Sequence, residues 1–173
     1  MKGHGRSKIW FHLAALATAL SVAGLCVSGQ ENAPKPTVFQ LGDCRIAVLE
    51  VSFWRDWMPI VAHPGPDHGS PLRAVIKLRL SNSSAADVKL AWTAAVIGND
   101  GKSNPLEFRA LPDGGAIWNR TLTKGGSREI VMTAQDGPYL PVGSLVCVEM
   151  IWTDQKNKTV LVKTPKAPIG RTD

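Results

Sequence analysis

The stretch "LRAVIKLRLSN", residues 72–82, decides the fold class because apolar and charged side chains alternate along it. Its apolar positions are Leu72, Ala74, Ile76, Leu78 and Leu80, and its cationic positions are Arg73, Lys77 and Arg79. Successive side chains of a strand point to opposite faces, so this period of two predicts a strand with one face on a core. The stretch "DVKLAWTAAVI", residues 87–97, repeats the pattern after a short Ser-Ser-Ala-Ala link, which predicts an antiparallel hairpin.

Other segments of β-type composition lie on both sides of this pair. They are residues 44–54, 106–111, 116–123, 128–134, 144–154 and 158–165. Turn sequences such as Asn-Asp-Gly at residues 99–101 separate them, and no segment has the period of a helix. The pattern predicts an all-β fold, an antiparallel immunoglobulin-like β-sandwich of seven to eight strands over residues 42–165. We expect residues 30–41 to be an extended leader and residues 166–173 to be a flexible tail.

The first 29 residues have the layout of a secretory signal peptide. A start with three cationic residues precedes an apolar run over residues 9–25 and then small residues. We expect cleavage after Gly29, with a cut after Ala23 as the alternative. An uncleaved anchor is the other interpretation, but the run is shorter than the roughly 20 apolar residues of a spanning helix. The sequence therefore predicts an exported protein, periplasmic or extracellular, with no stable membrane span after cleavage.

Cys26 raises the alternative of a bacterial lipoprotein anchored at that cysteine. Lipoprotein signals place a small residue immediately before the cysteine, and this chain has Leu25 there. Lipid anchoring at Cys26 is therefore not expected.

The formal charge of +6 overstates the basicity of the exported part. Three of the 20 basic residues and none of the 14 acidic residues lie within residues 1–29, so removal of that segment leaves +3. The remaining basic residues are scattered, with no run of like charge, which argues against nucleic acid as a partner.

Two cysteines remain after cleavage, Cys44 and Cys147, and they are 103 residues apart. An even number of cysteines in an exported chain predicts a disulfide, because extracytoplasmic compartments are oxidising. In the chain-entropy model a loop of that size is worth up to about 4.7 kcal/mol. The alternative is two buried free thiols, which are common in protein cores.

The segments "IKLRLSNSSAADVKLAW", "GNDGK" and "LTKGGSREIVM" follow one another in an order that resembles small bacterial exported domains of the FxLYD and telokin-like kind. The match spans about residues 75–133 and consists mostly of turn sequences. The Pro-Gly of that family is Gly125-Gly126 here, and its aromatic signature is absent. The resemblance implies a non-catalytic extracytoplasmic domain and assigns no catalytic residues.

Motifs of the common enzyme classes are missing from the chain. It has no Gly-x-Ser-x-Gly nucleophile elbow, no Walker or dinucleotide-binding glycine loop, no Cys-x-x-Cys and no His-Glu-x-x-His. We therefore expect a non-enzymatic protein without a cofactor.

The stretch "WMPIVAHPGPDHGSP", residues 57–71, makes one connection unusually long. About 17 residues separate the two flanking strands, whereas hairpin loops usually need about 2 to 5. Long loops on rigid sandwiches commonly carry recognition, and tryptophans beside such a loop can stack on a sugar ring or a partner side chain. We expect a surface that binds a protein or a glycan and is formed by Trp54, Trp57, His63, Asp67 and His68.

Metal binding is the alternative function of the same loop. His63, Asp67 and His68 could offer two imidazoles and a carboxylate to one metal ion. Their spacing suits no regular element, and Pro64 and Pro66 enforce extended backbone that separates the side chains. The tryptophans also have an alternative role, which is packing at the edge of the core.

Overall fold

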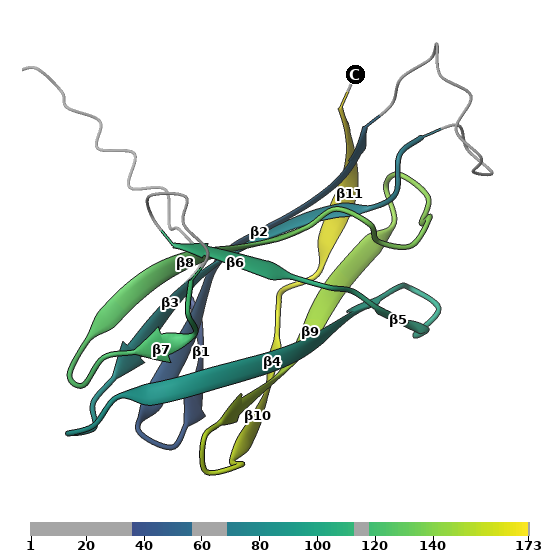
Figure 1. Ribbon diagram of the computed structural model, residues 1–173. Helices are drawn as coiled ribbons and strands as arrows, with labels where there is room; N and C mark the ends of the chain where they lie inside the picture. Colours follow the sequence, from purple (N-terminus) through teal and green to yellow (C-terminus); the bar gives the residue numbers. More distant parts are fainter. Residues whose placement is uncertain (1–35, 57–68, 113–117, 173) are drawn as a thin grey trace, which may run out of the picture. The chain divides into compact units, whose positions relative to one another are not determined.

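The computed structural model describes residues 36–56, 69–112 and 118–172, and these residues form eleven β-strands (Figure 1). The strands are β1 (Thr37–Leu41), β2 (Cys44–Asp56), β3 (Arg73–Asn82), β4 (Val88–Ile97), β5 (Ser103–Pro105), β6 (Arg109–Pro112), β7 (Thr121–Leu122), β8 (Ser127–Ala134), β9 (Leu145–Asp154), β10 (Thr159–Lys163) and β11 (Ala167–Thr172). Among the described residues there is no helix with the length and hydropathy needed to cross a membrane. The described part of the chain is all-β, as predicted, but has more strands than the seven to eight expected.

The strands form two layers joined by β11 (Figure 1). In the first layer the order is β2–β3–β8–β6, and β1 and β11 share the free edge of β2. In the second layer the order is β5–β4–β9, with β10 paired to β9 and β7 paired to β4. β11 pairs in parallel with β2 over residues 169–172 and antiparallel with β9 at Ala167 and Pro168. The result is a β-sandwich whose hydrogen-bonded path passes between the layers through one strand.

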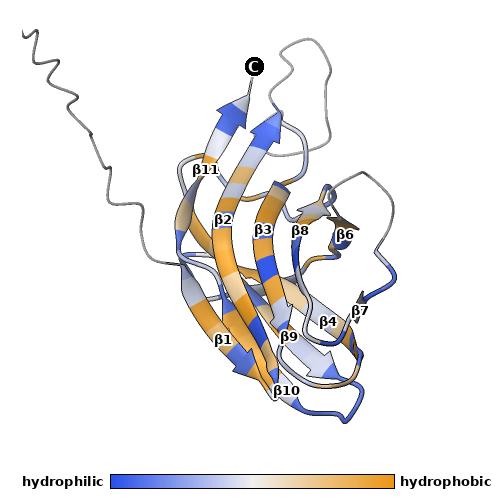
Figure 2. Ribbon diagram, turned by 90° about the vertical axis from the view of Figure 1, so that its left-hand side faces the viewer, coloured by the Kyte–Doolittle hydropathy of each residue, from blue (hydrophilic) through white to orange (hydrophobic). Residues whose placement is uncertain are grey.

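The core side chains come from the alternating positions that the sequence predicted. The fully buried residues of β3 are Ala74, Ile76, Leu78 and Leu80, and those of β9 are Val146, Val148, Met150 and Trp152. On the opposite face of β3, Arg79 is exposed. Figure 2 shows this alternation as orange and blue segments along β2 and β3. Burial of these apolar surfaces, at about 25 cal/mol per Å², drives the two layers together.

A bulge in β2 keeps both halves of this long strand facing the core. The pairing with β3 shifts between Val48 and Glu50, so Leu49 has no residue opposite. Before the bulge the buried positions are even-numbered, as at Val48, and after it they are odd-numbered, as at Phe53 and Arg55. The extra residue restores the inward phase that a regular strand would have lost.

The hairpin predicted from residues 72–97 does not form. β3 pairs with β2 and β8, and β4 pairs with β9, so the two strands lie in different layers. Asn82 holds the crossing connection, because its side-chain amide donates to the carbonyl oxygens of Ala86 and Thr123 at 2.8 and 3.1 Å. Residues 144–154 and 158–165, which the sequence predicted as β segments, contain the antiparallel pair β9 and β10.

Three segments that were expected to be irregular form strands. Residues 37–41 of the expected leader form β1, residues 103–105 form β5, and residues 167–172 of the expected loose tail form β11. β1 and β11 add to the free edge of β2, where unpaired N–H and C=O groups accept any extended segment of suitable geometry.

The predicted disulfide between Cys44 and Cys147 is absent, and both residues are buried free thiols. Burial, and then the nearby carboxylate of Asp154 at the end of β9, raise the pKa of the Cys44 thiol. Cys147 lies seven residues before Asp154 on the same strand, which places it roughly 23 Å from that end at about 3.3 Å per residue. Disulfides need Cα atoms within about 7 Å, so the prediction was wrong because the two cysteines lie at different ends of the sandwich.

An ion network covers part of the outward face of the first layer. The carboxylate of Glu129 on β8 accepts hydrogen bonds from Arg79 Nη2 at 2.6 Å and Nε at 3.0 Å, and lies 3.1 Å from Lys77 Nζ. The hydrogen bonds from Arg79 and then from Lys77 hold the pKa of Glu129 below its ordinary value. Because the network is accessible to solvent, its contribution to stability is modest and falls with salt.

Candidate functional site

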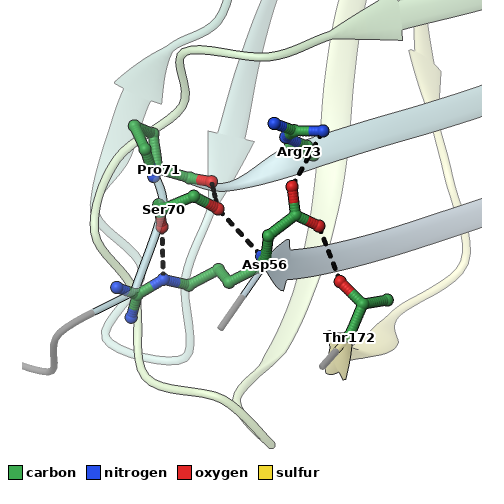
Figure 3. Close-up of polar contacts among 6 residues, drawn as sticks. Asp56, Ser70, Pro71, Arg73 and Thr172 are labelled. Atoms are coloured by element: carbon green, nitrogen blue, oxygen red, sulfur yellow. Dashed lines mark hydrogen bonds and ion pairs between the residues drawn. The ribbon is translucent and has the colours of Figure 1, made fainter. Parts of the chain in front are cut away.

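Reciprocal hydrogen bonds join the residues that flank the segment formed by residues 57–68, and Figure 3 shows the one between Asp56 and Ser70 Oγ. Asp56 precedes this segment, and Ser70 follows it. The backbone N–H of Ser70 donates to the Asp56 carbonyl oxygen at 2.9 Å, and the backbone N–H of Asp56 donates to Ser70 Oγ at 2.8 Å. The segment is therefore attached to the sandwich at a position that β2 and β3 determine.

The carboxylate of Asp56 ties a third strand to the same point (Figure 3). Its Oδ2 lies 2.8 Å from Nη1 of Arg73 on β3, and its Oδ1 accepts a hydrogen bond from Thr172 Oγ1 on β11 at 2.6 Å. The pair with Arg73 is partly exposed and is worth at most about 1 kcal/mol. Its effect is geometric, because it holds the ends of β2, β3 and β11 together beside the segment.

Arg55 connects this point to the chain that leads into β9. Its side chain is 0 % exposed, although arginine is among the residues least often buried. Nε donates to the Ser70 carbonyl oxygen at 2.8 Å and Nη1 donates to the Leu140 carbonyl oxygen at 3.0 Å, while the guanidinium lies 5.4 Å from the centre of the Tyr139 ring. A buried cation is tolerated when hydrogen bonds replace its water. We call Arg55, Asp56, Ser70, Arg73 and Thr172 together the loop brace.

Exposed apolar side chains gather in the chain segment that Arg55 binds. Tyr139, Val142 and Leu145 are 39 %, 40 % and 45 % exposed, and they are half of the large apolar side chains that the described residues expose. The backbone N–H of Gly143 donates to the Ile169 carbonyl oxygen at 2.8 Å, which holds this segment against β11. Grouped apolar side chains in water are typical of an interaction surface.

Trp54 is the predicted site residue that the structure describes. It is half-buried on the outward face of β2, opposite Arg73 of β3 and Gly170 of β11. A Cβ placed on Gly170 would lie 3.9 Å from the Trp54 Cβ, so the neighbouring position on β11 carries no side chain. Aromatic rings commonly cover such glycines in sheets, so both the binding role and the packing role of Trp54 stay predictions.

The other predicted site residues, Trp57, His63, Asp67 and His68, lie outside the described residues. The binding surface and the metal set that they would form both stay predictions. Within the described ranges, no group of three or more His, Cys, Asp and Glu side chains could hold a metal ion. The sequence analysis missed Arg55, whose inward position could be inferred only from the buried phase that follows the bulge.

A separate groove of about 650 Å³ opens between the layers. Its apolar walls are Trp92 and Ala94 of β4 and Leu106 and Phe108 of the connection from β5 to β6. Thr133 and Gln135, at the end of β8, close the other side.

Trp92, which lines this groove, contacts two further tryptophan rings. The half-buried Trp92 lies parallel to Trp118, with ring centres 6.2 Å apart and 6° between the planes, and tilts by 37° against Trp152 at 5.1 Å. Trp92 also packs against the hydrophobic core. The Arg120 guanidinium lies 4.5 Å from the centre of the Trp92 ring, a cation–π contact worth about 0.5–1 kcal/mol at an exposed site.

Comparisons with known proteins identify the fold and no family. The chain matches no family model and no curated protein sequence. An uncharacterised β-sandwich protein from Clostridium difficile 630 is similar in structure, with a TM-score of 0.50 and 10 % identity over 77 % of this chain and 93 % of that one. A DUF4426 family protein from Pseudomonas aeruginosa PAO1 has a TM-score of 0.44 and 16 % identity over 80 % of this chain and 97 % of that one. The similarity to the Clostridium difficile protein supports a β-sandwich, and none of the comparisons supports the FxLYD or telokin-like assignment.

Proposed function

We propose that this protein is an exported, non-enzymatic binding domain that contacts a protein partner through the end of the sandwich where the loop brace lies. The contact surface consists of the loop over residues 57–71 together with Tyr139, Val142 and Leu145. The observation that carries the proposal is the grouping of half of the exposed large apolar side chains of the described residues beside a loop whose two ends are hydrogen-bonded to each other.

The loop brace matters for binding because it reduces the entropy lost on association. A loop with free ends must be ordered by its partner, and that ordering subtracts from the affinity. Here the ends are joined by two hydrogen bonds, and Arg55 adds a contact with the segment of Tyr139. A rigid base that presents a variable loop is a common arrangement in recognition domains built on sandwiches.

The proposed export and lack of catalysis rest on the sequence. Residues 1–29 have the layout of a cleaved signal peptide, and the chain contains none of the common catalytic motifs. N-terminal sequencing of the protein recovered from outside the cytoplasm should begin at Gln30. Recovery of the full-length chain from the cytoplasm alone would contradict the export.

The binding surface is tested by capture from the exported fraction with three matched variants. We expect one protein to be retained by the parent chain and lost with Trp57→Ala and with Tyr139→Ala. It should still be retained with Leu161→Ala, which removes a 51 % exposed apolar side chain from β10. Equal capture by all three variants would contradict the proposed surface.

Two further measurements separate the alternative functions of the same loop. If the parent chain binds a glycan on an array and Trp57→Ala does not, the ligand of this loop is a carbohydrate and not a protein. If the parent chain binds copper or zinc tightly in a titration and the double variant His63→Ala/His68→Ala does not, the ligand of this loop is a metal ion.

A further inference from the structure

The edge of β4 that faces the groove has a gap in its hydrogen bonding. On this edge the N–H of Leu90 donates to the Arg120 carbonyl oxygen at 2.9 Å, and the carbonyl oxygen of Ala94 accepts from the N–H of Leu106 at 3.0 Å. Alternate residues of an antiparallel strand direct both backbone groups to the same edge. The N–H and C=O of Trp92, midway between these two positions, therefore point to this edge as well.

The two strands that pair with this edge of β4 do not reach Trp92: one ends before it and the other begins after it. β7 pairs with Val88 and Lys89, and β5 pairs with residues 95–97. Between them the chain crosses to the other layer as β6. In the described part of the chain, neither backbone group of Trp92 has a hydrogen-bond partner across this edge, and the groove lies there.

Arg120 is held in a strained conformation beside this gap. Its φ is 64°, in the left-handed region that residues with a side chain adopt at a cost. The turn around it is fixed, because Trp118 Nε1 donates to the Thr121 carbonyl oxygen at 3.0 Å and the N–H of Thr121 donates to Asn119 Oδ1 at 3.1 Å. The exposed guanidinium of Arg120 lies over Trp92, and no carboxylate of the described residues forms an ion pair with it.

The charges of the groove disfavour a ligand with a large net charge of one sign. Arg109 and Arg120 line it together with Glu107 and Asp136, so its formal charge is zero. A polyanion such as a nucleic acid would meet two carboxylates as well as two guanidinium groups. A peptide can place one carboxylate beside a guanidinium and direct its amide groups elsewhere.

We propose that this groove binds an extended peptide segment of a partner protein. The backbone of the peptide exchanges one pair of hydrogen bonds with the N–H and C=O of Trp92, as in the addition of a strand to an open sheet edge. An Asp or Glu side chain of the same peptide accepts hydrogen bonds from the Arg120 guanidinium, a charge-assisted interaction that fixes the position of the peptide. The site is distinct from the surface that the loop brace supports.

Selection of short linear peptides displayed on phage against the full chain tests the proposal. We expect the selected peptides to share an Asp or Glu at one position. Arg120→Gly should weaken their binding by about tenfold or more, the loss expected for a hydrogen bond between charged groups. Glycine adopts a φ of 64° readily, so this variant keeps the backbone of the turn. The matched control is Arg128→Ala, which removes an exposed arginine at the opposite end of β8 and should leave binding unchanged.

Amide hydrogen exchange reports the backbone part of the proposal. A selected peptide should slow exchange at the Trp92 amide and leave the Leu90 amide unchanged, because Leu90 is already hydrogen-bonded to Arg120. Binding should also survive Trp57→Ala, which separates this site from the loop. Selected peptides without a shared acidic position, equal affinity for Arg120→Gly, or no protection at Trp92 would each overturn the proposal, as would binding of a glycan or polyanion in place of peptides.

Discussion

Replacement of Asn82 by alanine should destabilise the protein strongly although no apolar contact of the core is removed. Asn82 is 2 % exposed at the end of β3. Its Nδ2 donates to the carbonyl oxygens of Ala86 at 2.8 Å, Thr123 at 3.1 Å and Leu122 at 3.3 Å, and its Oδ1 accepts from the N–H of Ser84 at 2.9 Å. One side chain therefore joins the end of β3, the crossing connection and the end of β7.

The expected loss follows from these bonds. The side-chain amide of Asn82 has two N–H groups, so it can make two full hydrogen bonds to the three carbonyl oxygens. With the bond that Oδ1 accepts, the side chain makes three full hydrogen bonds. A neutral hydrogen bond contributes about 1 kcal/mol, and a buried group left without a partner costs more. We expect Asn82→Ala to lower the free energy of unfolding by about 3 kcal/mol, which for a domain of this size lowers Tm by roughly 10 °C.

Urea denaturation followed by tryptophan fluorescence measures this loss. The midpoint should fall while the m-value stays unchanged, because the surface exposed on unfolding is the same. Asn99→Ala, which changes an exposed turn residue, is the control and should alter the free energy of unfolding by less than about 0.5 kcal/mol. A loss below about 1 kcal/mol for Asn82→Ala would refute the reasoning, because the crossing connection would then be held by other contacts.

Three further predictions concern other parts of the sandwich. Gly137→Ala would place a Cβ 2.8 Å from the Leu72 carbonyl oxygen, and this overpacking should cost about 1–3 kcal/mol in urea denaturation. The lowered pKa of Glu129 gives stability that is present above the unfolded pKa and is lost as pH falls through the folded pKa. Over that acidic range the parent should lose more stability than Glu129→Gln, and parallel losses would contradict the assigned cause. The thiols of Cys44 and Cys147 should resist alkylation until the protein unfolds, and a mass that rises on reduction would show a disulfide instead.

The strands with a clear period of two were predictable, and their partners were not. Alternation along residues 72–82 identified the inward side chains of β3, because the apolar residues of an alternating strand are the ones that become buried. The predicted hairpin with β4 was wrong, because the bonds that direct the crossing connection come from Asn82 to residues far away in sequence. Which strands pair with each other depends on contacts between distant residues, and the hydrophobic pattern of one segment does not predict those contacts.

The weak points of the prediction lie where tertiary contacts override local sequence. β11 contains Pro168 and Gly170, which disfavour strands, and it is ordered by the free edges of β2 and β9. Arg55 was not recognised because the bulge at Leu49, six residues before it, changes the inward phase of β2. For the candidate site, the sequence identified the long connection and Trp54, whereas the loop brace, the exposed segment around Tyr139 and the groove required the fold.

The position of β11 has a consequence for the order in which this protein is made. It is synthesised after every other described strand, yet it is the strand through which the hydrogen-bonded path passes from one layer to the other. Until β11 has been synthesised, the parts of the β2 and β9 edges that pair with it stay without a partner strand, and the two layers are not joined by hydrogen bonds. A polypeptide that is threaded through a translocation channel must remain unfolded until it emerges. For the exported protein that we propose, a sandwich whose layers are joined only by its last described strand meets that requirement through its topology.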